Sequence, residues 1–178
     1  MKAWHEAGHN TLRIAVNLSA RQFQQRDLTS MIEEVLKEHD YPPELLDIEI
    51  TESTAMQNAD VSLAVMKRLR SMGVRISIDD FGTGYSSLSY LKRFPIDTVK
   101  IDQNFVRDLS DASNDGAIIT AVISMARALN LRVVAEGVET EAQLAFLRRE
   151  NCEVVQGFLH SKPVSAAEFE TSLRARRR

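Results

Sequence analysis

Six short aliphatic segments of the sequence end in, or lie next to, side chains that can bind a cation or a phosphate. The side chains at these ends are those of Asn17, Glu49, Asp79 with Asp80, Lys100, Glu136 and Gln156. Amide and carboxylate oxygens are the ligands that Mg²⁺ and Mn²⁺ prefer in proteins. Converging carboxylates repel one another unless a cation or protons neutralise them. The set therefore predicts a site for one or two divalent cations.

The neighbouring pair Asp79 and Asp80 has a further requirement, because successive side chains of a strand point to opposite faces. Both carboxylates reach one site only if the strand ends at Asp79 and the chain turns there. The following Phe81-Gly82-Thr83-Gly84 supplies residues for such a turn. Two adjacent aspartates could then bridge two metal ions about 3.5–4 Å apart, activate a water and support an in-line displacement at phosphorus. Lys100 would add positive charge for a phosphate or orient the water.

The elements that must position these side chains follow from the hydrophobic pattern. The expected strands are 13–18, 46–51, 74–79, 98–102, 132–136 and 153–156. Amphipathic stretches that are expected to be helices separate most of them, at 20–39, 61–72, 117–129 and 140–149. Strands that alternate with helices of this length indicate βαβ units in a parallel sheet.

The alternation of apolar and polar residues along the expected strands distinguishes a doubly wound parallel sheet from a parallel barrel. One face of each strand is aliphatic, whereas the other carries a polar group at or near its C-terminal end. A doubly wound sheet would be apolar on both faces, and polar groups at strand C-termini are typical of barrel enzymes. The predicted fold class is therefore α/β, a (β/α)₈ TIM-barrel-like fold that is incomplete, with about six βα units. We divide the chain into a remnant of a preceding helix and loop (1–12), a partial barrel (13–173) and a basic C-terminal tail (174–178).

Composition and charge argue against several classes of protein. The chain of 178 residues has 22 Lys and Arg against 25 Asp and Glu, a formal net charge of −3, which argues against a nucleic acid polymer as partner. No apolar run approaches the ~20 residues of a membrane helix, and residues 1–10 lack the pattern of a secretory signal. The single Cys152 excludes a disulfide framework and suits a reducing compartment. We therefore expect a cytoplasmic protein without a membrane segment.

Other interpretations of single motifs are weaker. His5-Glu6-Ala7-Gly8-His9 fits the zinc pattern H-E-x-x-H, but Gly8 and Asn10 interrupt the helix that this pattern requires. Gly82-Thr83-Gly84 is similar to a dinucleotide loop, but Ser87 replaces its third glycine and the two preceding aspartates would repel a pyrophosphate. A different metal-dependent barrel, such as an enolising enzyme with Lys100 as base, is a further alternative.

Longer blocks of the sequence carry a resemblance to a known family. The blocks occur in order and are Val16-Asn17-Leu18-Ser19-Ala20, Glu49-Ile50-Thr51-Glu52-Ser53, Asp79-Asp80-Phe81-Gly82-Thr83-Gly84-Tyr85-Ser86-Ser87-Leu88, Lys100-Ile101-Asp102, Glu136-Gly137-Val138-Glu139 and Gln156-Gly157-Phe158. Together they resemble the EAL domain, the bacterial cyclic di-GMP phosphodiesterase, from about Trp4 to Pro163. The resemblance implies a (β/α)₈-type barrel that hydrolyses one phosphodiester of cyclic di-GMP to linear pGpG with Mg²⁺ or Mn²⁺.

The resemblance also implies roles for single residues. Asn17, Glu49 and Asp79 would ligate the first metal ion, and Asp79, Asp80 and Glu136 would serve the second. Lys100, Glu136 and Asp80 are the candidate catalytic residues, with Lys100 holding the attacking water. The remaining candidates are Gln156 in the water and substrate network, Glu52 as the anchor of loop 81–87, and Glu139 in a supporting role.

The sequence departs from the family pattern at its N-terminal side. The Glu-Ala-Leu signature, whose glutamate is a metal ligand, belongs before Arg13 and is absent, as is an arginine that binds the substrate phosphate. We therefore expect an N-terminally truncated barrel in which the two-metal site lacks one ligand, so that this chain is inactive or weakly active. The alternative is a non-catalytic module that binds cyclic di-GMP or a protein. Unpaired sheet edges at 13–18 and 153–156 predict a homo-oligomer or a domain-swapped assembly.

Overall fold

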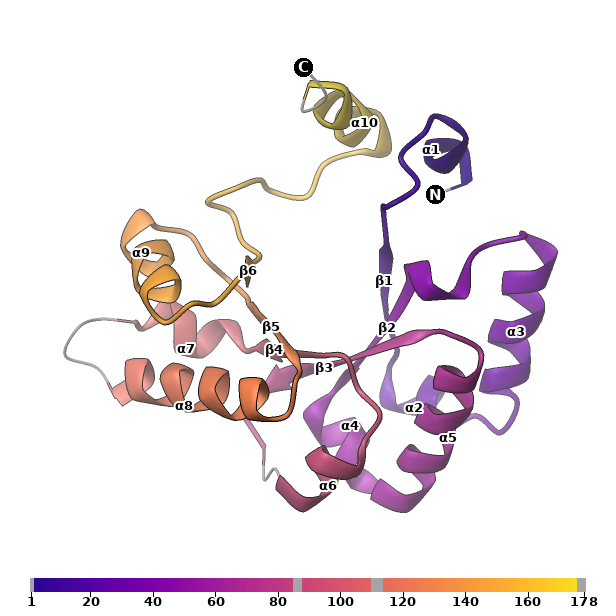
Figure 1. Ribbon diagram of the computed structural model, residues 1–178, viewed down its shortest axis with the longest axis horizontal. Helices are drawn as coiled ribbons and strands as arrows, with labels where there is room; N and C mark the ends of the chain where they lie inside the picture. The colour runs from indigo at the N-terminus through magenta and orange to yellow at the C-terminus, as the bar shows by residue number, and fades with distance from the viewer. Residues whose placement is uncertain (1, 85–87, 110–113, 176–178) are drawn as a thin grey trace.

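The core of the fold is one curved parallel sheet. The computed structural model describes residues 2–84, 88–109 and 114–175. Within these residues the strands are β1 (Ile14–Asn17), β2 (Leu46–Thr51), β3 (Arg75–Phe81), β4 (Thr98–Ile101), β5 (Arg132–Ala135) and β6 (Val154–Val155). They lie in sequence order and every neighbouring pair is parallel. The sheet curls into a half-barrel with the helices on its outer side, which confirms the predicted incomplete α/β barrel (Figure 1).

Helices lie between successive strands and at both ends of the described chain. They are α1 (Lys2–Glu6), α2 (Ala20–Phe23), α3 (Leu28–Glu38), α4 (Glu52–Gln57), α5 (Ala59–Ser71), α6 (Leu88–Arg93), α7 (Gln103–Arg107), α8 (Asn114–Ala128), α9 (Glu141–Arg149) and α10 (Ala166–Ala175), with a 3₁₀ turn at Pro43–Leu45. The outward side chains of the strands, such as Ile50, Ile78 and Ile101, are fully buried beneath this layer. The helical layer therefore holds the strands in register and leaves their other face to line the interior.

The helix that the sequence predicts over 20–39 is broken in the structure. A capping box at Ser19 and Gln22 starts α2, which ends at Phe23, and α3 begins only at Leu28. Phe23 and Leu28 are both buried, at 3% and 1% exposure. On one continuous helix, residues five positions apart point about 140° away from each other. The break lets both side chains enter the same core, so this prediction was wrong because packing overrides the local pattern.

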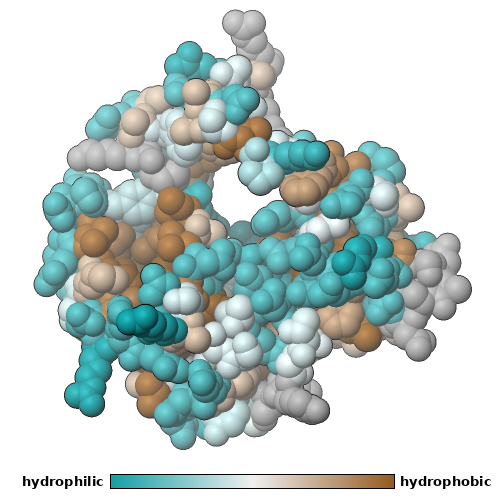
Figure 2. All heavy atoms as spheres, turned by 180° about the vertical axis from the view of Figure 1, so that it is seen from behind, coloured by the Kyte–Doolittle hydropathy of each residue, from teal (hydrophilic) through white to brown (hydrophobic). Residues whose placement is uncertain are grey.

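The two ends of the described chain meet outside the sheet. The ring of Trp4 in α1 lies 5.0 Å from that of Phe169 in α10, measured between centroids, whereas β1 and β6 each pair on one side only. The molecule has an opening near its centre, below the helices at the chain ends (Figure 2). The half-barrel is thus open between β1 and β6. Within the described residues, the structure has no helix long and apolar enough to span a membrane.

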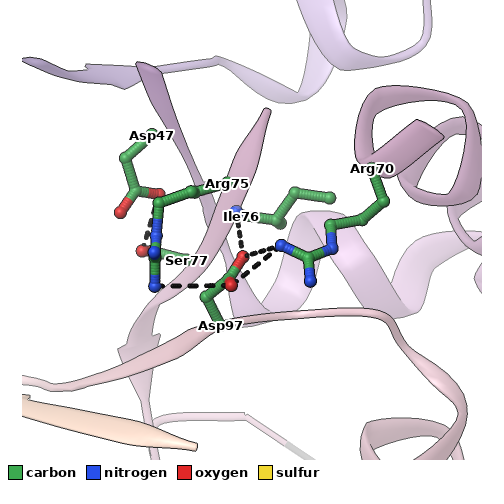
Figure 3. A network of polar contacts seen from close by, with 6 residues as sticks. All are labelled: Asp47, Arg70, Arg75, Ile76, Ser77 and Asp97. Atoms are coloured by element: carbon green, nitrogen blue, oxygen red, sulfur yellow. Dashed lines mark hydrogen bonds and ion pairs between the residues drawn. The ribbon is translucent and has the colours of Figure 1, made fainter. Parts of the chain in front are cut away.

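A polar network fixes the end of the sheet where β3 and β4 begin (Figure 3). The carboxylate of Asp97 accepts hydrogen bonds from Arg70 Nη1 at 2.8 Å and from the backbone N–H of Ile76 at 3.0 Å, and it forms an ion pair with Arg75 at 3.4 Å. The backbone of Asp97 also bonds to Ile76 and to Arg132. One half-buried residue therefore ties α5, β3 and β5 together.

We expect Asp97→Asn to lower the free energy of unfolding by about 2 kcal/mol, because it removes the charge that two arginines share while keeping one acceptor. Asp60→Asn is the matched control, since the Asp60 side chain is 77% exposed in its ion pair with Arg93 and should cost less than about 0.5 kcal/mol. Urea unfolding of the three proteins measures both changes. Equal midpoints for the two variants would show that the network does not stabilise the sheet.

The sheet edges generate a second prediction. An unpaired strand can pair with another chain, and every residue of β1 is exposed. We expect this chain to self-associate at micromolar concentration, and we expect Val16→Lys in β1 to shift it toward the monomer. Val61→Lys, at an exposed position of α5, should leave the distribution unchanged. Sedimentation velocity distinguishes the species, and a monomeric parent chain would contradict this expectation.

Candidate functional site

The site is organised around the buried ammonium group of Lys100 on β4. Its Nζ atom lies 2.9 Å from Glu49 Oε2, 3.2 Å from Asp79 Oδ1 and 2.8 Å from Glu136 Oε1. The first two partners are on β2 and β3, and Glu136 directly follows β5. Four neighbouring parallel strands therefore place their functional groups at one rim, as the strand alternation predicts.

The adjacent aspartates reach this rim by a different route from the one expected. Strand β3 continues through Asp79 and Asp80 to Phe81, and its register against β4 shifts between Ile78 and Phe81. Asp80 has a φ of 53°, in the left-handed region, and its N–H donates a hydrogen bond to Asp79 Oδ1 at 3.0 Å. The irregularity lies inside the strand rather than in a turn after Asp79. The prediction that the strand ends at Asp79 was therefore wrong, although both carboxylates do converge.

Three carboxylates at the rim form a group suited to a cation. Asp79, Asp80 and Glu136 each offer an oxygen, and these oxygens lie within 4.8 Å of one another. Hard divalent cations such as Mg²⁺ and Mn²⁺ bind such oxygen donors. This donor set therefore fits a divalent cation.

The electrostatics of the rim reflect this crowding of like charges. Burial raises the pKa of Glu136, an effect that Lys100 opposes and Asp79 reinforces. Burial and then the charges of Asp79 and Asp102 raise the pKa of Asp80. For Lys100, burial alone would lower the pKa, but hydrogen bonds to Glu136 and Glu49 raise it above its ordinary value. The ammonium is therefore firmly protonated, whereas the carboxylates favour a further positive charge.

Asp102 joins this group although the sequence analysis assigned it no role. Its side chain is buried and accepts a hydrogen bond from the N–H of Asn104 at 2.7 Å, at the start of α7. It also contributes to the raised pKa of Asp80. The sequence pattern could have identified Asp102. It lies two residues after Lys100, and side chains two positions apart on a strand point to the same face.

Asn17 and Gln156 lie at the two ends of the rim. Asn17 is in register with Glu49 on β2. Gln156 follows β6, where its N–H donates to the carbonyl of Ala135. A Cβ on the next residue, Gly157, would clash with the carbonyl oxygen of Val138, so this close backbone approach requires glycine. Both polar side chains are exposed, and the open sector of the half-barrel lies between them.

A cavity lies along the interior of the half-barrel. Its volume is about 420 Å³, and its lining includes Glu49, Ser77, Lys100 and Gln156. The cavity reaches the strand-end rim at Glu49 and Lys100, but Asp79, Asp80 and Glu136 do not line it. The carboxylate group thus sits at the rim itself, above the polar interior.

Glu52, at the start of α4, contacts the segment that follows β3. It is 1% exposed, and its Oε2 accepts a hydrogen bond from the N–H of Gly82 at 2.8 Å. A Cβ on Gly84 would lie 2.9 Å from Glu52 Oε1, so the segment packs directly on this carboxylate. Of the expected loop 81–87, residues 85–87 lie outside the described part of the chain.

The zinc pattern near the N-terminus does not form a comparable group. Helix α1 ends at Glu6, and the ring of His5 hydrogen-bonds to the carbonyl of Leu12 at 3.1 Å and stacks on Tyr41. In the described ranges, the rim carboxylates are the one group of three or more possible metal ligands. His5, Glu6 and His9 are not brought together.

Comparisons with known proteins agree with this geometry. The family model described as "EAL domain" matches residues 1–163. The chain is 50% identical over 173 residues to the bifunctional diguanylate cyclase/cyclic di-GMP phosphodiesterase MucR of Pseudomonas aeruginosa, covering 97% of this chain and 25% of that protein. The PaMucR phosphodiesterase, solved in complex with c-di-GMP, superposes with a TM-score of 0.92 at 50% identity, over 95% of this chain and 68% of that one.

A structure containing a metal is also similar. The manganese/cy-diGMP complex of BlrP1 from Klebsiella pneumoniae has a TM-score of 0.80 and 34% identity, over 89% of this chain and 41% of that one. The chain spans about a quarter of the length of the curated relatives it matches. The family model covers most of this chain, and the half-barrel superposes on a solved structure that is 50% identical in sequence. The chain therefore belongs to the EAL domain family.

Proposed function

We propose that this chain carries the metal-binding rim of a cyclic di-GMP phosphodiesterase, which hydrolyses one phosphodiester bond to give linear pGpG. The observation that carries the proposal is the convergence of Asp79, Asp80 and Glu136, whose oxygens lie within 4.8 Å of one another. The relatives support the choice of substrate, because PaMucR was solved with c-di-GMP and BlrP1 with cy-diGMP and manganese.

The proposed roles follow from the chemistry of each side chain. Asp79, Asp80 and Glu136 would hold a divalent cation, and Asn17 and Glu49 with Asp79 would hold another. When bound, such ions polarise the phosphoryl oxygens and lower the pKa of water. Lys100 donates hydrogen bonds from a protonated Nζ and can orient the attacking water or stabilise charge that develops on phosphate oxygens. Gln156, which lines the interior cavity, would contact the substrate.

A non-catalytic module that binds cyclic di-GMP or a protein is the second candidate. The open sector between β1 and β6 favours it, because substrate would be enclosed on one side only. The same opening supports the expectation that hydrolysis by this chain alone is weak. Turnover and binding therefore have to be measured separately.

We expect slow hydrolysis of cyclic di-GMP that requires Mn²⁺ and falls at least about 100-fold in Asp79→Asn, because one carboxylate ligand becomes an amide. Asp60→Asn, which removes an exposed carboxylate on α5, should retain the parent rate. Chromatographic separation of pGpG measures turnover. Binding of cyclic di-GMP without any turnover would favour the module, and turnover that is equal in Asp79→Asn would contradict the proposed site.

We further propose that Glu52 anchors the segment that follows β3. Glu52→Ala leaves the Gly82 N–H without its acceptor, which should cost about 2–3 kcal/mol of stability and speed hydrogen exchange at Gly82. Glu52→Gln keeps an acceptor and should have a smaller effect. Glu44→Ala, at an exposed position of the 3₁₀ turn, is the control. Unchanged exchange at Gly82 in Glu52→Ala would refute the anchoring role.

A further inference from the structure

The ion pairs of Lys100 differ from the others in the described part of the chain. In each of its three pairs, both side chains are less than a fifth exposed, with Lys100 itself at 5%. The other pairs have at least one partner that is more exposed. Buried charges are stable only when they are paired and hydrogen-bonded. The Lys100 ammonium therefore balances part of the carboxylate charge at a site that solvent reaches poorly.

The balance at the rim is incomplete. Even without Asp102, the carboxylates of Glu49, Asp79, Asp80 and Glu136 face one ammonium group, which leaves a formal charge of −3 when all are ionised. Without Lys100, that charge would rise to −4 on side chains from neighbouring strands. Like charges at this spacing repel one another strongly in a partly buried site. The Lys100 ammonium thus offsets part of the repulsion between these carboxylates.

Lys100 and a divalent cation would compete for the same carboxylates. Two of the three residues in the candidate cation group, Asp79 and Glu136, also form ion pairs with the Lys100 ammonium. A carboxylate oxygen that binds a cation is a weaker acceptor, and the ammonium and the cation repel each other at this range. Binding of a cation therefore has to weaken some of the Lys100 ion pairs.

We propose that Lys100 is the resident counter-cation of the metal-free site. It holds Glu49, Asp79 and Glu136 together before a divalent ion binds, and it lowers the affinity for that ion in return. This inference rests on the proposed function for the presence of a metal site, but it concerns folding and metal affinity rather than hydrolysis. It assigns Lys100 a positioning role in the metal-free protein, in addition to any contact with water or phosphate.

The matched variants Lys100→Met and Lys67→Met test this role, because each removes one ammonium while keeping an unbranched side chain. Lys67 lies on the exposed side of α5, in the outer layer of helices. In EDTA, we expect Lys100→Met to lower the melting temperature by about 10 °C, because buried carboxylates lose their partner. Calorimetric titration with MnCl₂ should show at least a tenfold tighter dissociation constant for Lys100→Met. Lys67→Met should match the parent chain in both measurements.

The outcomes separate this inference from the proposed function. Equal or weaker Mn²⁺ binding by a folded Lys100→Met overturns the counter-cation role and leaves the metal site intact. Absence of Mn²⁺ binding in the parent chain and in Lys100→Met contradicts the proposed function itself. An unchanged melting temperature of Lys100→Met in EDTA also contradicts the counter-cation role.

A measurement on the parent chain covers the case in which Lys100→Met does not fold. The Nζ resonance of Lys100 can be followed by ¹⁵N NMR during titration with MgCl₂, together with the backbone amide of Asp79. We expect slowly exchanging Nζ protons without Mg²⁺, and faster exchange with a shifted resonance at saturation. A constant Nζ resonance alongside a shifting Asp79 amide overturns the inference. If neither signal responds to Mg²⁺, the proposed metal site is absent.

Discussion

The site depends on the attraction between one buried ammonium group and the carboxylates that crowd around it. All neighbouring strands are parallel, so their carboxyl ends share one edge of the sheet and bring like charges together. The fully buried outward residues Ile50, Ile78 and Ile101 prevent the strands from separating to relieve the repulsion. Lys100, on the central strand β4, is positioned to reach partners on both sides.

The fold could be predicted where it depends on alternation along a strand. Ile48 and Ile50 of β2 are buried outward, whereas Glu49 between them faces the interior, and this pattern is visible in the sequence itself. The break between α2 and α3 was not predictable in the same way, because it depends on where Phe23 and Leu28 must both pack. Helix patterns report which residues are apolar, but they do not report which part of the core each one enters.

The sequence likewise predicted some features of the site and missed others. Strand ends identified Glu49, Asp79, Lys100 and Glu136, and the structure brings these four side chains together. The left-handed backbone of Asp80 was missed, because an aspartate with positive φ costs on the order of 1 kcal/mol and is tolerated only where tertiary contacts impose it. The buried Asp102 was missed because its main visible role, a cap on α7, is also common at positions without function. The roles of Glu52 and Gln156 came from the family resemblance and remain predictions.

The claim that the rim holds a divalent cation is tested most directly by crystals of this chain grown with MnCl₂. Anomalous scattering at the manganese edge should reveal a peak at coordination distance from carboxylate oxygens of Asp79, Asp80 and Glu136. The Nζ atom of Lys100 should then lie farther from at least one of its present partners. A peak confined to other surface carboxylates, with the three Lys100 ion pairs unchanged, would contradict this explanation of the site.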